Sequence, residues 1–372
     1  MDTVIEHLID ALESRIALFD KECQAGQTTK KSAEIDATDL MLRYSTDLVF
    51  SCFYKQYNII DYNSEREFYS AQFEDGLNAI EHPLIEISMV IPILKMFLNW
   101  FITHFHKFGE MKLLIMGFVK DQTVLNMQAR REMAAAKKAG KTFDPENFKL
   151  SDGRVFKSNM IDGFIDSYHE GKVTKTEYMH SSFFLINAGI RTVADALAQL
   201  LYFLASNQRV QEKLRNSIKK DGIESEYLGW CINETLRVGT PVPFGSTRMA
   251  EQDFEVEGGV VPKGTIVHTP TQVIHRLPEY WGEDANQFRP ERWAEADKFH
   301  PAQFMPFGGG LRVCPGREFA MYDLRKVTQA LLSRYKIERC PKTSDSPLYH
   351  SPLMLFLKRE IPIYVGISRL NN

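Results

Sequence analysis

The chain of 372 residues carries 45 lysines and arginines against 48 aspartates and glutamates, so its formal net charge is −3. This near balance excludes a protein that binds polyanions through its net charge. With 44% hydrophobic and 25% charged residues, the composition is that of a globular chain, and it excludes disorder, collagen and a polytopic membrane protein. The length predicts two or three domains, or one large catalytic unit.

The five cysteines are widely spread and form no CxxC or CxC pair. Such a set predicts neither a disulfide framework nor a structural zinc site, and it favours a reducing compartment. The first residues show no basic stretch followed by an apolar one. We therefore expect no signal peptide or anchor at this start of the chain.

Helices are expected through most of the chain. Asp144 and Pro145 break the helical pattern, and a polar loop is expected from there to Gly153. Thr174 and Glu177 resemble a capping box that opens a long apolar helix. Apolar periodicity predicts helices over residues 4–19, 39–52, 109–141, 174–206, 208–219, 225–238 and 317–336.

Strand character is expected only in the last third of the chain, over residues 252–257, 265–270, 353–358 and 362–367. A long irregular stretch runs from Pro278 to Gly316. A connection of that length inside a compact protein is usually functional.

The most apolar window covers residues 87–108. Pro92 and Lys95 interrupt it, so it lacks the roughly 18 to 20 unbroken apolar residues of a membrane span, and it predicts a buried helix pair. Trp100 and Lys107 leave a second interpretation open, in which this surface contacts a bilayer at its interface.

The stretch that points most directly to chemistry is the glycine-rich loop from Phe307 to Gly316, which contains Cys314 and precedes an amphipathic helix. Backbone N–H groups and the positive end of the helix dipole favour a thiolate at Cys314. The cysteine is therefore a candidate nucleophile or a soft metal ligand. Haem iron would need one axial thiolate and small residues that let the macrocycle approach.

The loop resembles the haem-thiolate motif of the cytochrome P450 family, Phe-x-x-Gly-x-Arg-x-Cys-x-Gly. Every fixed position matches, with Phe307, Gly310, Arg312, Cys314 and Gly316. The resemblance implies that Cys314 is the axial ligand of the iron in haem b and that the other four residues shape the cofactor site. It also implies a fold that is mainly α with a small β portion.

A second match is Glu234-Thr235-Leu236-Arg237, whose i, i+3 spacing puts a carboxylate and a guanidinium on one helix face. It resembles the family's Glu-x-x-Arg helix. Arg292 lies in an element similar to the family's Pro-Glu-Arg-Phe, with Trp293 in place of Phe. The resemblance implies a structural network of Glu234, Arg237 and Arg292 that pins the irregular stretch beneath the haem.

A third match, Ala188-Gly189-Ile190-Arg191-Thr192, resembles the distal pattern of the family. There the small residues make room for dioxygen, and the threonine hydroxyl relays protons. Arg191 replaces the usual acidic residue. We expect slow or rerouted oxygen activation, or a reaction that does not need it.

Two arginines, Arg248 and Arg312, occupy positions where the family's arginines pair with haem propionates. An ordinary surface arginine is the alternative for Arg248. His275 resembles a family element beside the haem, and we expect it to be a hydrogen-bonded structural histidine.

The chain is most similar to the microsomal steroid- and drug-oxidising animal members, including thromboxane-synthase-like ones. The supporting residues are 233–237, 262–264 and Cys340-x-x-Thr343. This resemblance implies a lipophilic substrate and the cytosolic face of the endoplasmic reticulum membrane. The family's substrate-facing segments fall at residues 87–105, 183–192, 241–246 and 351–356.

The resemblance begins at what resembles the family's fourth lettered helix. We therefore expect a single truncated P450 domain over residues 1–372, helix-rich over 1–240 and holding the β structure and haem loop over 241–372. The anchor, the first sheet strands and the helix with a propionate-binding Trp-x-x-x-Arg have no counterpart before Ile5. The link between Lys219 and Tyr227 is also short.

Three functions follow. The first is a haem-thiolate monooxygenase that receives electrons from an NADPH-dependent flavoprotein reductase, with cytochrome b5 as a further donor, docking near Arg317, Arg325 and Lys326. The second is a haem-thiolate isomerase or lyase that acts on a lipid peroxide, supported by Arg191. The third is a haem-poor, non-catalytic fragment. Reductase-dependent turnover separates the first from the second, and haem stoichiometry separates both from the third.

Overall fold

The structure is a computed structural model, and it describes residues 1–25, 32–54, 107–159, 161–245, 247–343 and 362–370. Residues 87–106 of the apolar window, the expected strand 353–358 and the substrate-facing segment 351–356 lie outside these ranges. Contacts divide the chain into two compact units. The first unit comprises Met1–Leu8 and Leu42–Arg191, and the second comprises Ile9–Met41 and Thr192–Asn372.

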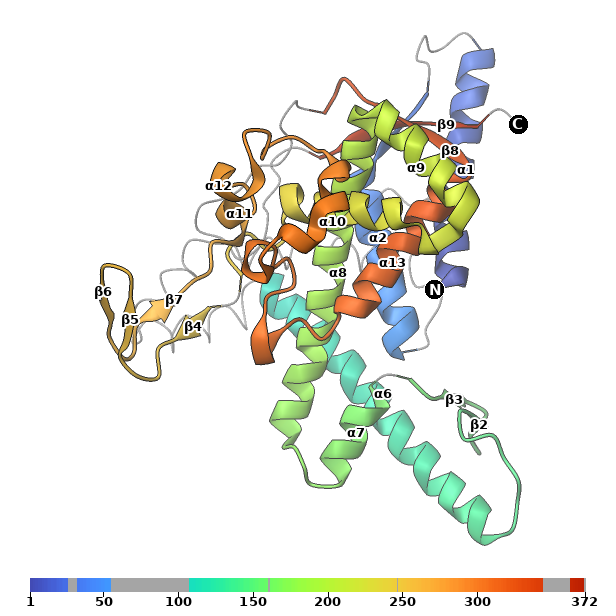
Figure 1. Cartoon of the computed structure of the whole chain (residues 1–372). Helices are drawn as coiled ribbons and strands as arrows, with labels where there is room; N and C mark the ends of the chain where they lie inside the picture. Colours follow the sequence, from blue (N-terminus) through green and yellow to red (C-terminus); the bar gives the residue numbers. More distant parts are fainter. Residues whose placement is uncertain (26–31, 55–106, 160, 246, 344–361, 371–372) are drawn as a thin grey trace. The chain divides into compact units, whose positions relative to one another are not determined.

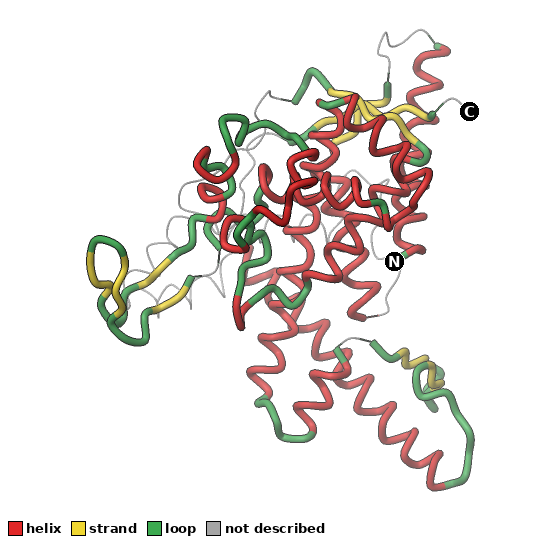
Figure 2. The backbone as a smooth tube through the Cα atoms, in the orientation of Figure 1, coloured by secondary structure: helices red, strands yellow, loops and turns green. Residues whose placement is uncertain are grey.

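Helices make up most of the described chain (Figure 2). The α-helices are α1 Asp2–Gln24, α2 Ala37–Tyr54, α6 Lys107–Lys138, α7 Asp162–His169, α8 Lys175–Ser206, α9 Gln208–Asp221, α10 Glu226–Gly239, α11 Thr271–Ile274, α12 Pro278–Trp281 and α13 Arg317–Leu332. Short 3-10 turns are η1 Gly222–Glu224, η2 Pro290–Lys298, η3 Pro301–Gln303 and η4 Gly310–Arg312.

In the first unit, helix α6 contacts α7 and a small hairpin of β2 Asn147–Lys149 and β3 Val155–Lys157. Ala129, Leu150 and Phe156 form the buried centre of this contact. The expected capping box of α8 is confirmed. The Thr174 amide donates to a carboxylate oxygen of Glu177 over 2.7 Å, and the Glu177 amide donates back to the Thr174 hydroxyl over 3.2 Å.

The second unit contains an antiparallel sheet in which β9 Tyr364–Arg369 lies between β1 Ala33–Asp36 and β8 Tyr335–Arg339 (Figure 1). Ile35, Val365, Ile337 and Ile367 are buried in this sheet. Helix α10 contacts α9 and α13, and α13 contacts β8. Two further hairpins pair β4 Arg248–Met249 with β7 Ile266–Val267, and β5 Phe254–Val256 with β6 Gly259–Val261.

Several expectations about the elements are wrong. Strands are not confined to the last third, because β1, β2 and β3 lie before residue 160. These strands have three or four residues, which is too few to show a clear period of two. The last helix ends at Leu332 and not at residue 336, since Tyr335 and Ile337 alternate buried positions along β8. About half of the stretch 278–316 lies in α12 and the turns η2, η3 and η4, and the rest is irregular.

Among the described residues, α8 is the one helix long and apolar enough to cross a membrane by length and composition. Of its most apolar window, 61% is buried inside the protein. A buried core helix passes the same test, and burial of this degree is what such a helix shows.

Helix α10, which carries Glu234 and Arg237, begins with a buried cap. The Ser225 hydroxyl accepts a hydrogen bond from the Leu228 amide over 3.1 Å, and the two serine hydroxyls of Ser217 and Ser225 lie 2.8 Å apart. We predict that Ser225→Ala lowers the free energy of unfolding by about 1 to 2 kcal/mol, because it leaves a buried helix amide without its acceptor. Urea unfolding measures this loss. Ser333→Ala, at the exposed end of α13, is the control, and an equal loss there would contradict the prediction.

Candidate active site

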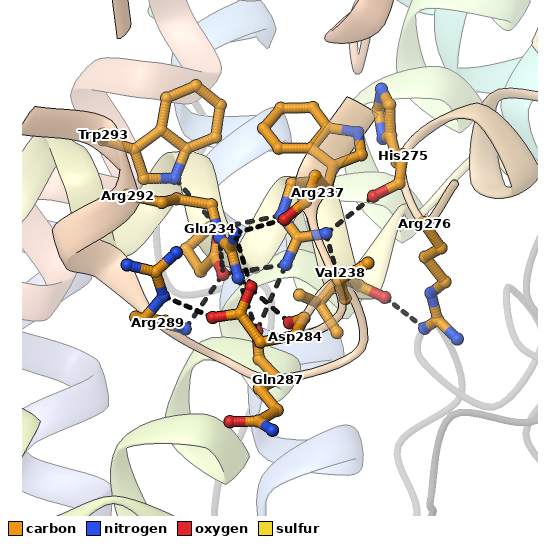
Figure 3. Close-up of polar contacts among 12 residues, drawn as sticks. Glu234, Arg237, Val238, His275, Arg276, Asp284, Gln287, Arg289, Arg292 and Trp293 are labelled. Atoms are coloured by element: carbon orange, nitrogen blue, oxygen red, sulfur yellow. Dashed lines mark hydrogen bonds and ion pairs between the residues drawn. The ribbon is translucent and has the colours of Figure 1, made fainter. Parts of the chain in front are cut away.

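Glu234 and Arg237 form a buried ion pair on one face of α10 (Figure 3). Both side chains are fully buried. The guanidinium donates two parallel hydrogen bonds, from Nε to Oε2 over 2.9 Å and from Nη2 to Oε1 over 2.8 Å. This bidentate geometry is the one in which an arginine binds a carboxylate most strongly.

The same carboxylate gathers donors from η2 and the residue before it. Arg292 Nε and the Arg289 amide each donate to Glu234 Oε1 over 2.9 Å, and the indole N–H of Trp293 donates to Oε2 over 3.0 Å. With the two bonds from Arg237, five hydrogen bonds within the described residues converge on one carboxylate. A buried charge is stable only when it is satisfied in this way.

The two arginines also hold the backbone of the irregular stretch. Arg237 Nη1 donates to the carbonyls of His275 over 2.7 Å and Ala285 over 2.6 Å. Arg292 Nη1 donates to the Trp281 carbonyl over 3.0 Å, and Arg292 Nη2 donates to the Asp284 carbonyl over 3.1 Å. The network therefore fixes the segment 275–285 against α10, because backbone carbonyls of this segment accept hydrogen bonds from charged donors.

Aromatic rings cover this network. Trp281 and Trp293 are buried, with ring centroids 5.7 Å apart, and Phe299 and Phe304 pack against them. The Arg237 guanidinium lies 4.9 Å from the Trp281 ring centroid. Rings around the ion pair exclude water and strengthen its electrostatic interactions.

The cysteine loop is closed by backbone hydrogen bonds. The Cys314 amide donates to the Phe307 carbonyl over 2.9 Å, and the Gly308 amide donates to the Met305 carbonyl over 3.1 Å. Gly308 and Gly310 have φ values of 72° and 66°, a conformation that side-chain-bearing residues rarely adopt. The sequence needs glycine at these two positions for the loop to return Cys314 to the start of α13.

The loop presents apolar surface and a thiol to the outside. Leu311 is fully exposed, at 105%, and Val313 and Cys314 are also exposed. The neighbouring glycines carry no side chain, and the exposed Arg312 adds a cation. A soft sulfur donor, apolar neighbours and a guanidinium fit a flat apolar macrocycle that carries iron and carboxylates. The residues present thus fit haem.

The distal residues of the third motif lie on α8. Arg191 is 8% exposed, so the residue in the acidic position is a largely buried cation. A Cβ added at Gly189 would meet Val49 Cγ2 at 3.1 Å, so close packing against α2 is one physical reason for this glycine. Ala188 and Thr192 are half-buried. The roles of Ala188, Gly189 and Thr192 beside dioxygen stay predictions.

The remaining expected cations differ in their surroundings. Arg248 is exposed on β4 and donates to the carbonyl of Thr247 over 3.1 Å. Arg317 is exposed at the start of α13. Arg325, by contrast, donates to the carbonyls of Ile223 over 2.6 Å and Ser225 over 3.2 Å. The Nη1 atom of Arg325 therefore joins α13 to η1, and the part of Arg325 in docking stays a prediction.

His275 is fully buried between the network and the loop. Burial, together with the Arg237 guanidinium beside it, lowers the pKa of its imidazole to about 3. The folded protein therefore keeps His275 neutral, while the unfolded chain binds a proton near pH 6.5. We predict that His275 removes about 2 kcal/mol of stability as the pH falls from 7 to 5.

Urea unfolding at both pH values, with His275→Gln as the comparison, measures this contribution. The variant lacks the titrating ring, so its stability is expected to fall less between pH 7 and pH 5. Equal pH slopes for the two proteins would contradict the low pKa.

The sequence did not reveal three features of the site: the Trp293 indole donor, the Arg289 amide donor and the partners of the His275 ring, which was expected only to be hydrogen-bonded. The substitution of Trp for Phe at position 293 was visible in the sequence. It carried no information about which acceptor the indole would reach, since Glu234 lies 59 positions away.

Comparison with known proteins identifies the family. The family profile described as Cytochrome P450 matches residues 9–367. The chain belongs to the cytochrome P450 family, and the expected fold class, mainly α with a small β portion, is confirmed.

Curated relatives are similar over about half of the chain. Cytochrome P450 3A15 of Cavia porcellus is 35% identical over 193 residues, which are 48% of this chain and 38% of the relative. Cytochrome P450 3A13 of Mus musculus is 33% identical over 208 residues, 52% of this chain and 41% of the relative. The matched part spans about two fifths of the length of these relatives.

Proposed function

We propose that this protein is a haem-thiolate monooxygenase that inserts one oxygen atom of O2 into a lipophilic organic substrate. The observation that carries the proposal is the exposed Cys314 at the start of α13, in a glycine loop with every fixed residue of the haem motif. Membership of the cytochrome P450 family supports it.

Haem, when bound, supplies the iron at which dioxygen is reduced and activated. Cys314 provides the thiolate ligand, and the turns at Gly308 and Gly310 keep side chains away from the macrocycle. The guanidinium groups of Arg312 and Arg248 pair with the propionates. The Thr192 hydroxyl donates and passes protons on the distal side, where Ala188 and Gly189 leave space.

The network of Glu234, Arg237 and Arg292 supports this site without touching the reacting atoms. It holds the segment that leads into the cysteine loop, so the thiolate is presented in one position. A rigid support of this kind is what a preorganised ligand requires.

Electrons come from an NADPH-dependent flavoprotein reductase, with cytochrome b5 as a further donor. The exposed Arg317 and the half-buried Lys326 supply positive charge on α13 for docking. Similarity to the P450 3A proteins supports a location on the cytosolic face of the endoplasmic reticulum membrane as part of this proposal.

The first experiment is a reduced, carbon-monoxide difference spectrum of the chain expressed with added haem. A Soret band at the long wavelength typical of thiolate ligation, with one haem per chain, is expected. Reductase-dependent consumption of NADPH with a lipophilic substrate then tests monooxygenation. A chain that binds no haem would contradict the proposal and leave the non-catalytic fragment.

Arg191 favours a second candidate, an isomerase or lyase that acts on a lipid peroxide. A buried guanidinium on α8 replaces the usual carboxyl group, and a substrate that already carries the oxygen needs no proton delivery to O2. Conversion of an organic hydroperoxide without reductase or NADPH would support this candidate. Under the favoured proposal, product formation instead requires both.

A further inference from the structure

The His275 ring connects the glutamate–arginine network to the cysteine loop. Its Nε2 atom accepts a hydrogen bond from the Met305 amide over 3.0 Å, and its Nδ1 atom lies 3.3 Å from the Thr240 hydroxyl. The backbone carbonyl of the same residue accepts from Arg237. One buried residue thus contacts the network through its carbonyl and the start of the loop through its ring.

The hydrogen bonds assign the tautomer of this ring. The Met305 amide can only donate, so Nε2 carries no proton. The Thr240 hydroxyl donates its single proton to the Arg237 carbonyl over 2.7 Å, so it must accept from Nδ1–H of His275. Both ring nitrogens have hydrogen-bond partners in the neutral form. The low pKa of the ring keeps it in this form.

The Met305 amide lies at the entrance of the cysteine loop. The Met305 carbonyl accepts from the Gly308 amide, and the Phe307 carbonyl accepts from the Cys314 amide. The His275 ring also packs against Phe304, with ring centroids 5.3 Å apart. The described hydrogen bonds therefore run from α10 through the histidine into the loop that carries the thiol.

We propose that His275 is a positioning residue, which sets the conformation of the cysteine loop through its Nε2 acceptor and so fixes the thiolate ligand. The proposal rests on the function proposed above for Cys314. It does not place His275 in contact with haem or substrate. Loss of the Nε2 acceptor loosens the cysteine loop, while the Glu234 network stays intact.

Two substitutions of His275 distinguish the role of the Nε2 acceptor from that of the rest of the ring. In His275→Gln, the side-chain oxygen can take the place of Nε2 and accept from the Met305 amide. In His275→Asn, the shorter amide reaches only the position of Nδ1, so the Met305 amide loses its partner. Trp281→Phe is the control, because it removes a part-buried hydrogen bond of the same length, from the indole N–H to the Ile274 carbonyl over 3.0 Å.

The first measurement uses the chain without added haem. Hydrogen exchange of the peptide that spans residues 305–314 is followed by mass spectrometry, together with alkylation of Cys314 by iodoacetamide. The exposed Cys23 on α1 serves as the internal reference thiol. We expect exchange of the Met305 and Gly308 amides to rise by about tenfold in His275→Asn, with a changed Cys314 alkylation rate relative to Cys23. His275→Gln should stay close to the wild type.

The second measurement is the carbon-monoxide spectrum of the haem-loaded proteins. His275→Asn is expected to shift part of the thiolate band toward the band of a neutral ligand, and His275→Gln should restore it. If Trp281→Phe at equal global stability loosens the 305–314 peptide as much as His275→Asn does, or if His275→Gln fails to restore the loop, the proposal is overturned.

The two proposals fail in different ways. A wild-type chain that shows no thiolate band contradicts the haem function. The exchange and alkylation measurements on the haem-free chain still decide whether His275 sets the loop. A wild-type band together with an unchanged loop in His275→Asn contradicts the role of His275 alone.

Discussion

Cys314→Ser is expected to abolish the long-wavelength Soret band of the reduced, carbon-monoxide-treated protein. Cys314 is exposed just before α13, and its position is set by the hydrogen bond that its backbone amide donates to the Phe307 carbonyl. A serine hydroxyl remains protonated at neutral pH, so it does not replace an anionic soft ligand. The substitution changes one atom in an exposed loop, and we expect the unfolding transition to stay within about 0.5 kcal/mol of the wild type.

Cys23→Ser is the matched control, because Cys23 is also exposed but lies on α1, outside the haem motif. Its spectrum should equal that of the wild type. Survival of the thiolate band in Cys314→Ser would show that another group binds the iron, and the assignment of the ligand would be wrong.

Glu234→Gln is expected to cause the largest loss of stability, about 3 to 5 kcal/mol in the free energy of unfolding. The neutral amide has nearly the same shape, but it leaves the buried guanidinium groups of Arg237 and Arg292 without their counter-charge. Its NH2 group also faces donors, such as the Trp293 indole N–H, with which it cannot form hydrogen bonds. Urea unfolding at neutral pH measures the loss.

Glu212→Gln provides the control for the change of charge alone. Glu212 pairs with Arg215 over 2.6 Å, but its side chain is 63% exposed. Exposed pairs contribute about 0 to 1 kcal/mol, and we expect a loss in that range. If both substitutions had the same small effect, the network would contribute little to stability and the irregular segment would be held by its aromatic packing.

The Glu234 network shows which contacts a sequence pattern can predict and which it cannot. Glu234 and Arg237 could be paired from the sequence because three helical positions separate them, and helical geometry alone brings such residues together. Arg292 was assigned through its resemblance to a family element. The bond from Trp293, the amide of Arg289 and the occupation of Arg325 by backbone carbonyls depend on how loops fold back onto α10 and α13. No local period encodes these contacts.

The short strands show the same limit. Strand β1 has four residues, and its partner β9 lies more than 300 positions later, where Ile35 pairs with Val365. A segment of that length has too few alternations to be distinguished from a loop, and its conformation is decided by the partner. Helices α8, α9 and α10 could be located, because each repeats its apolar face over several turns and two of them begin at capping residues.

By itself the sequence determined the helical character of this protein, the cysteine loop and the pairing of Glu234 with Arg237. Each of these features depends on residues that lie near one another along the chain. Tertiary structure decided which donors complete the Glu234 carboxylate, why His275 is neutral and which atoms it joins. Those features arise from burial and from contacts between distant segments. Polar groups that are removed from water need hydrogen-bond partners inside the protein, and only the folded chain brings those partners within hydrogen-bond distance.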